Sequence, residues 1–282
     1  MKQKETIEYI RYLSEKYNDP AYFKEDPIIF PKHFAQLLRL GSSDFDFPVP
    51  NNYKVRLQDI EIAAVIAAHL AWGRREIIVR DIKRAMDEMG WKPYSYILNG
   101  DYKRMFDTQK SLHRTIKWCE FAQICDNLNR FYAKHSSIEE LTVDQIRVEI
   151  YAQKSNPKGA NKKIEMLRRW MVRDDGIVDL GIWKKIKPCD LIIPLDVHVH
   201  KSALNLGITK RSSADFTTAK EITHFLKLCF PNDPAKGDFA LFAHSIESSR
   251  NDKMKMKEKE RNGRRERRRE ERIKVEDIQN NK

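Results

Sequence analysis

The residues best placed for chemistry lie in one short stretch, LIIPLDVHVHKSALNLG at positions 191–207. The proline two residues before Asp196 makes it hard to extend a helix backward, so we expect Asp196 to cap a helix that ends at Gly207. His198 and Lys201 then stand near the N-terminal amides of this helix. A carboxylate, an imidazole and an ammonium group at a helix N-terminus suit a phosphate backbone held beside a reacting centre.

A purely structural role for Asp196 is the first alternative. Aspartate caps many helices without taking part in any chemistry. In that case the helix only packs against the core through its expected apolar face: Val197, Ala203, Leu204 and Leu206.

A metal site is the second alternative for the same residues. Asp196, His198 and His200 form a D-x-H-x-H pattern, and barrel hydrolases present two imidazoles to zinc from His-x-His at a strand end. That architecture needs many strands after the motif, and the rest of this chain has no strand pattern. We therefore expect no metal site and rank a metal-dependent hydrolase last.

Residues 194–199, PLDVHV, resemble the signature of the helix-hairpin-helix superfamily of DNA glycosylases, in which an Asp opens a helix and is catalytic. Residues 60–89 resemble that superfamily's early helix pair, whose intervening turn probes the duplex. The chain to about Ser245 also resembles a bacterial family of uncharacterised proteins, most distinctively at residues 167–173, LRRWMVR. The resemblance implies a two-lobed helical fold in which the terminal helices form one lobe, with the active site in the cleft and Asp196 as the catalytic carboxylate.

A glycosylase that also cuts the strand needs a lysine that attacks the sugar carbon and forms a Schiff base. In the common branch of the superfamily this lysine follows a Gly-rich hairpin, but residues 176–178 of this chain are GIV. Lys162 heads a helix expected over residues 160–173, and an archaeal branch places its lysine at a comparable helix start. The resemblance therefore implies Lys162 as the nucleophile, with water as the alternative.

Two further sets of residues are candidates for contact with DNA. Lys162, Met166, Arg169 and Arg173 share one stripe of the expected helix, which either lines a DNA-facing cleft or is an ordinary solvated face. The second set occupies the turn where related glycosylases insert a side chain into the base stack, or is a helix end with a core tryptophan. Its members are Trp72, Gly73, Arg74 and Arg75.

Composition indicates a polyanionic partner. The chain has 282 residues, 41% of them apolar, and a formal net charge of +12, so it can bury a substantial core. Residues 247–282 hold 14 Lys and Arg against 9 Asp and Glu, a net charge of +5, which leaves +7 on residues 1–246. We expect a basic helical domain over 1–246 that binds DNA or structured RNA, and a basic low-complexity tail over 247–282 that is a solvated helix or disordered.

Apolar residues recur at helical spacing along the chain, so we predict an all-α fold. No apolar run approaches the roughly 18–20 residues that cross a bilayer, and the N-terminus lacks the pattern of a signal peptide. We expect a cytoplasmic, nucleoid-associated monomer without membrane contact. The four cysteines contain no C-x-x-C pair, and none follows Cys229, where superfamily members that hold an iron–sulfur cluster have closely spaced cysteines. We therefore expect no cofactor.

These features together predict a DNA-repair protein of the base-excision type, which cleaves the N-glycosidic bond of a damaged base and has an accompanying AP lyase activity. The alternative from another class is a non-catalytic nucleic-acid-binding protein with the same fold.

Overall fold

The computed structural model describes residues 3–48 and 51–245, together with Glu247, Ser248, Met254, Met256, Glu260, Arg261 and Arg264. Most of the regular structure in these residues is helical, which confirms the predicted all-α class. Most of the expected basic tail, residues 247–282, lies outside the described part of the chain. Among the helices that are described, none is both long and apolar enough to cross a membrane.

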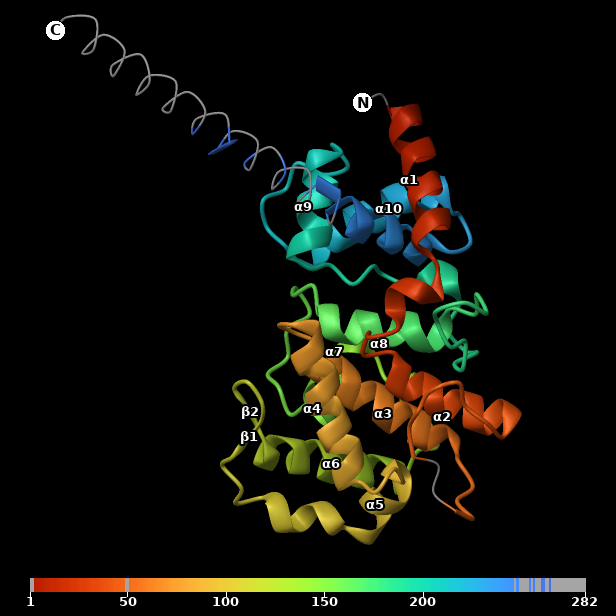
Figure 1. Cartoon of the computed structure of the whole chain (residues 1–282), viewed down its shortest axis with the longest axis vertical. Helices are drawn as coiled ribbons and strands as arrows, with labels where there is room; N and C mark the ends of the chain where they lie inside the picture. The colour runs from red at the N-terminus through yellow and green to blue at the C-terminus, as the bar shows by residue number, and fades with distance from the viewer. Residues whose placement is uncertain are drawn as a thin grey trace, which may run out of the picture.

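Two apolar cores divide the described chain into a larger and a smaller lobe (Figure 1). The core of the larger lobe is drawn mainly from residues 28–191, whereas that of the smaller lobe combines the N-terminal helix with residues after 192. The larger lobe contains α2 (Ile29–Leu40), α3 (Leu57–Leu70), α4 (Arg75–Glu88), α5 (Pro93–Asn99), α6 (Trp118–Tyr132), α7 (Val143–Gln145) and α8 (Lys162–Val172). The smaller lobe contains α1 (Gln3–Tyr17), α9 (Val197–Asn205), α10 (Phe216–Cys229) and helical residues 237–245.

Short elements connect these helices. They are η1 (Pro20–Phe23), η2 (Asp101–Met105), η3 (Ile138–Glu140), the π-helical η4 (Ile146–Ile150), η5 (Pro188–Asp190), η6 (Pro234–Lys236), and the strands β1 (Ser111–His113) and β2 (Ile116–Lys117). The chain passes from the smaller lobe to the larger one through η1 and returns after η5, so the N- and C-terminal helices share one lobe (Figure 1).

Helix α3 lies at the centre of the larger lobe because apolar residues occur on every side of it. Every residue from Asp59 to Leu70 is buried, and the helix packs against α2, α4, α5 and α8. Its buried Glu61 accepts hydrogen bonds from the hydroxyls of Tyr132 and Ser137 and from the indole of Trp183. The predicted helix pair over residues 60–89 is thus confirmed as α3 and α4, joined by a turn.

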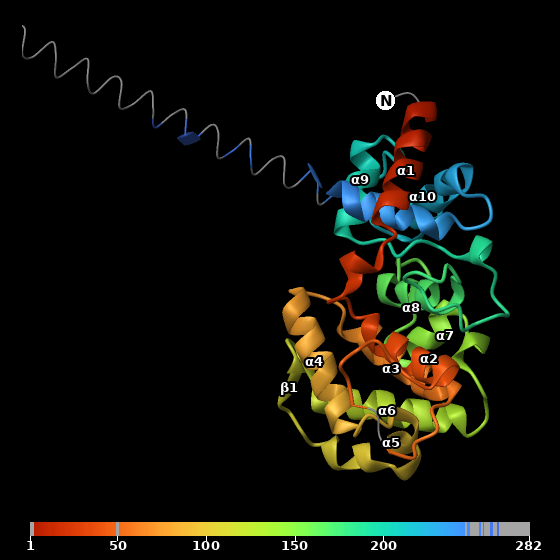
Figure 2. The ribbon, with the colours of Figure 1, turned by 45° about the vertical axis from the view of Figure 1, so that its right-hand side comes forward.

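The hairpin of β1 and β2 departs from the predicted helical pattern. Its turn residues, Arg114 and Thr115, do not belong to the Asn-Gly or Asp-Gly class that marks hairpins in a sequence. Leu112 and Ile116 are buried in the core of the larger lobe, and the hairpin lies beside α4 in both views (Figures 1 and 2). Tertiary burial, rather than turn chemistry, therefore holds these short strands.

Candidate active site

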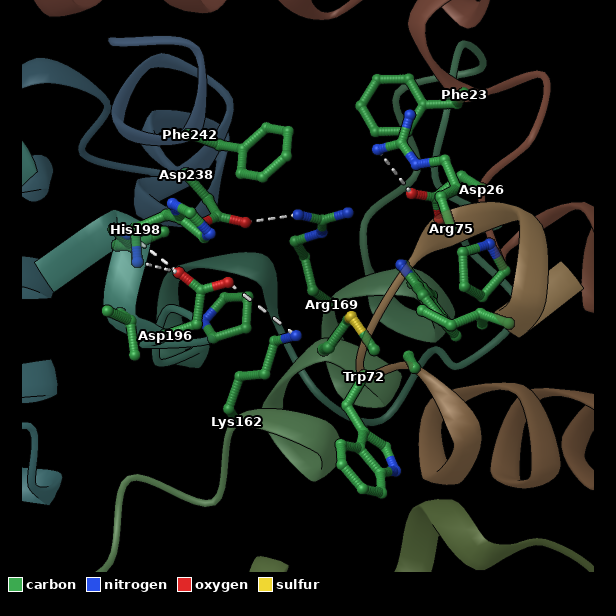
Figure 3. Close-up of a pocket in the computed structure, with 18 of the residues that line it drawn as sticks. Phe23, Asp26, Trp72, Arg75, Lys162, Arg169, Asp196, His198, Asp238 and Phe242 are labelled. Atoms are coloured by element: carbon green, nitrogen blue, oxygen red, sulfur yellow. Dashed lines mark hydrogen bonds and ion pairs between the residues drawn. The ribbon is translucent and has the colours of Figure 1, made fainter. Parts of the chain in front are cut away.

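A cavity of about 470 Å³ lies where the two lobes meet (Figure 3). The larger lobe contributes α8 and the turn between α3 and α4, and the smaller lobe contributes the start of α9 and part of helical residues 237–245. The segment that joins α1 to α2 adds Phe23, Asp26 and Pro27. The cavity thus has both charged and apolar walls.

Asp196 is the N-cap of α9, as the sequence predicts. Its Oδ1 accepts hydrogen bonds from the backbone amides of His198 and Val199, each at 2.9 Å. The helix ends at Asn205, slightly before the predicted stop at Gly207, which has a φ of +69°. Because one carboxylate oxygen is occupied by the helix, the other, Oδ2, faces the cavity (Figure 3).

The buried face of α9 differs from the expected one. Val197, expected in the core, is 78% exposed at the rim of the cavity, and Leu204 is also exposed. Ala203 is buried as expected, and Val199, one helical turn before it, is buried in place of Val197. The N-cap explains this difference. The Asp196 side chain turns back onto the first backbone amides of the helix, so Val197, the residue directly after it, points outward.

Lys162, at the first position of α8, faces Asp196 from the other lobe. Its Nζ lies 3.9 Å from Asp196 Oδ2, and the two side chains are 32% and 24% exposed. Their side chains point toward each other across the cavity wall (Figure 3). The structure therefore brings together the two residues that the sequence proposed as catalytic.

The predicted cationic stripe of α8 follows the cavity only in part. Met166 and Arg169 line it beyond Lys162, and Arg169 forms an ion pair with Asp238. Arg173 does not reach a surface, because its side chain is 1% exposed.

Arg173 is held inside the protein by carboxylates. Its Nε and Nη2 donate to Asp233, and its Nη1 pairs with Asp175 and Asp179. Burial alone would lower the pKa of Arg173, but these carboxylates raise it above the usual value. The prediction that Arg173 contacts DNA is therefore wrong. One turn beyond Arg169, the segments that carry these three aspartates cover the helix, and their carboxylates bind the guanidinium.

The turn between α3 and α4 forms another wall. Trp72 and Gly73 line the cavity, and Gly73 has a φ of +108°, which favours glycine. Arg74 is exposed and pairs with Glu76. Arg75 donates to the carbonyl of Tyr22 and lies 3.7 Å from Asp26, so it is tied to the segment between the lobes.

The imidazoles of the D-x-H-x-H pattern diverge. His198 lines the cavity, with Nδ1 3.1 Å from Ser245 Oγ, whereas the buried His200 uses Nε2 to donate to the carbonyl of Arg211. They do not converge on one point, which argues against the metal-hydrolase alternative. Lys201 is exposed, outside the residues that line the cavity.

Several cavity residues have no counterpart in the sequence predictions. Burial raises the pKa of Asp238 to about 6, against the opposing effect of Arg169. Burial also raises the pKa of Asp26, which Arg75 opposes. Three further wall residues that the sequence did not predict are aromatic: Phe23, Phe239 and Phe242. The sequence does contain a signal for the wall formed by Asp238, Phe239 and Phe242. It is the acidic residue that opens the otherwise apolar run at 238–243, DFALFA.

Lys163, the neighbour of the candidate nucleophile, has different surroundings. Its Nζ donates to the carbonyl of His69 at 2.6 Å, and it does not line the cavity. Burial lowers the pKa of Lys163 to about 8, helped by the positive charge of Lys162. The geometry thus favours Lys162 over Lys163 as the amine that meets a ligand.

Comparison with protein families gives one match, to DUF2400, a family described as a protein of unknown function. Two overlapping segments match, residues 48–156 and 145–247, which together cover most of the chain. Neither a curated protein nor a solved structure matches it.

Proposed function

The chain belongs to DUF2400, a family of unknown function, and we propose that it is a DNA-binding protein that cleaves the N-glycosidic bond of a damaged base and then nicks the strand. The observation that carries the proposal is the 3.9 Å separation of Lys162 Nζ and Asp196 Oδ2 at a cavity of about 470 Å³. This volume lies in the range of pockets that hold small ligands, about 300–1,000 Å³.

Asp196 supplies negative charge at a fixed point. Cleavage of a glycosidic bond develops positive charge on the sugar, and a carboxylate preorganised beside C1′ stabilises it. Two backbone amides fix Oδ1, so Oδ2 needs no reorganisation when that charge forms. The capping and the proposed catalytic role therefore use different oxygens of one side chain.

Lys162 supplies the nucleophile. Its ammonium group first gives a proton to water, and the neutral amine then attacks C1′. The bond from C1′ to the base breaks, and the electron pair leaves with the base, which takes a proton from water. The amine then passes a proton to O4′ as the sugar ring opens, and a protonated imine forms. Water takes a proton from C2′, and the electron pair of that C–H bond forms the C2′–C3′ double bond as the 3′ phosphate leaves, which cuts the strand. Asp196 Oδ2, 3.9 Å from Nζ, is placed to carry the amine proton to O4′.

The other walls suit a flat, partly polar ligand. Phe23 and Phe242 supply aromatic surface, and stacking on one such ring contributes about 1–3 kcal/mol per base. The basic charge of residues 1–246 favours a nucleic acid over a neutral small molecule as the source of that base.

The arrangement of lobes also supports a glycosylase-like fold. The N- and C-terminal helices share the smaller lobe, the middle helices form the larger one, and the cavity lies between them. This is the arrangement that the resemblance of PLDVHV to the superfamily's signature implies.

The test is base release from duplex oligonucleotides that carry oxidised, deaminated or alkylated bases. Asp196→Asn should slow release by about 10²–10³-fold, because it removes the charge that stabilises the transition state. DNA affinity should change little. Lys134→Ala, an exposed lysine outside the cavity, is the control and should release base at the wild-type rate.

A non-catalytic binder is the second candidate, and one observation favours it. The Lys162–Asp196 pair joins α8 of one lobe to α9 of the other, so it also serves as a salt bridge between lobes. Tight DNA or RNA binding without base release from any substrate would support this candidate over the enzyme.

A further inference from the structure

The β-hairpin and the turn between α3 and α4 form one rigid unit at the rim of the cavity. His113 of β1 is fully buried, with Nδ1 2.9 Å from Asp81 Oδ2 and Nε2 2.9 Å from the carbonyl of Trp72. Arg84 of α4 donates to the carbonyl of Leu112 at 2.9 Å. The hairpin is therefore bonded both to α4 and to the turn whose Trp72 lines the cavity.

This unit holds Arg114 at the tip of the hairpin, directly over the turn. The Arg114 guanidinium lies 4.4 Å from the centre of the Trp72 ring. Its Nη1 passes so close to Gly73 that a Cβ there would be 2.7 Å away. The backbone of Arg114 has a φ of +54°, and Ser111 Oγ donates to its carbonyl at 2.7 Å, so the tip is well defined.

Arg114 differs from the neighbouring arginines because they form ion pairs with carboxylates. Arg74 pairs with Glu76, and both Arg80 and Arg84 pair with Asp81. Within the described residues Arg114 has no ion-pair partner, and it is exposed. Lys110 and Lys117, at the base of the hairpin, are exposed as well. The rim next to the cavity therefore carries excess positive charge, with one planar guanidinium already oriented by a ring.

We propose that Arg114 binds a backbone phosphate of the DNA strand whose nucleotide enters the cavity. This inference rests on the proposed function. A guanidinium presents parallel N–H donors that match phosphate oxygens, and the contact with the Trp72 ring holds the Arg114 guanidinium at the rim before DNA arrives. A Cβ at Gly73 would lie 2.7 Å from Arg114 Nη1, so a side chain there would require the guanidinium to shift.

The experiment measures binding of the full chain to a labelled duplex with a central tetrahydrofuran abasic analogue, over a series of KCl concentrations. Each phosphate contact contributes close to one unit to the slope of log affinity against log salt. Arg114→Ala should weaken binding several-fold and reduce the slope by about one unit. Arg114→Lys should keep the slope, because the charge remains, but bind more weakly than wild type because the lysine does not stack.

Arg130→Ala is the matched control. Arg130 is an exposed arginine of α6, about 18 Å along the helix from the hairpin, and its removal should leave the slope unchanged. If wild type binds but Arg114→Ala keeps its affinity and slope, the inference fails while the proposed function stands. If both Arg114 variants bind more weakly with an unchanged slope, Arg114 only supports Trp72, which also overturns the inference. If wild type binds no duplex, both fail.

Discussion

The two ends of α8 carry cations with opposite surroundings. Lys162, at the first residue, is about one third exposed, and within the described part of the chain it pairs with one carboxylate, that of Asp196, at 3.9 Å. Arg173, just beyond the last residue, is 1% exposed and is held by Asp175, Asp179 and Asp233. Both belong to one predicted stripe, yet only the first faces the cavity.

The difference separates a charge that holds the fold from a charge that is available to a ligand. A buried arginine with several carboxylates is costly to lose, because removal leaves unpaired acids in the interior. A lysine that is about one third exposed and has one long contact contributes little to stability. The weaker end of the helix is therefore the end where chemistry is proposed.

The largest effect on stability is expected at Arg173. Arg173→Met should lower the free energy of unfolding by about 3–5 kcal/mol, since it strands buried carboxylates. Lys162→Met should lower it by less than about 1 kcal/mol, because its ion pair with Asp196 is long and partly exposed. Urea denaturation of both variants measures the contrast. Equal losses would break the comparison between the two ends.

Glu165 lies between Lys162 and Arg173 on α8, and it is a buried charge with only one long ion pair among the described residues. It is 1% exposed, its nearest cation is Arg168 at 3.7 Å, and burial raises its pKa to about 7. A folded-state pKa above the unfolded value means that stability falls as pH rises from about 4.5 to 7. Glu165→Gln removes this dependence.

We therefore expect Glu165→Gln to be more stable than wild type by about 1–3 kcal/mol at pH 8, with no such gain at pH 4.5. Thermal or urea unfolding of both proteins across this range gives the measurement. A gain that does not depend on pH would mean that Glu165 has the same pKa in the folded and unfolded states, which would contradict the prediction.

A smaller effect is expected at the rim, where backbone geometry rather than charge sets the shape. Gly73→Ala should cost about 1–2 kcal/mol, from its φ of +108° and from contact with Arg114. Gly41→Ala, with a φ of +72° and open space around it, is the control for strain alone. In an Arg114→Ala background the cost at Gly73 should fall, because the contact is gone. An unchanged cost would leave backbone strain as its whole cause.

Local patterns were sufficient for part of this account. Asp196 was predicted as a cap because the proline before it and the helix after it are adjacent in sequence. The α3–α4 pair and the start of the α8 stripe follow from helical periodicity. The pairing of Lys162 with Asp196 came from a resemblance, since their proximity depends on how two lobes meet.

Non-local packing decided the rest. Arg173 and Lys162 are equivalent on a helical wheel, and only the acidic segments that fold over the far end distinguish them. The hairpin at 111–117 has no turn signal and is held by burial of His113 and Leu112. Asp238 lines the cavity because residues far apart in the sequence pack together. The spacing of residues within one helix cannot predict such packing.

Borohydride trapping tests the central claim, that Lys162 and Asp196 form a catalytic centre, most directly. Wild-type protein is incubated with a duplex containing an abasic site and sodium borohydride, and the adduct is located by mass spectrometry of peptides. The account predicts a covalent adduct on Lys162 that is absent from Lys162→Ala and present in Lys134→Ala. No adduct with wild type, or one that persists in Lys162→Ala, would contradict it.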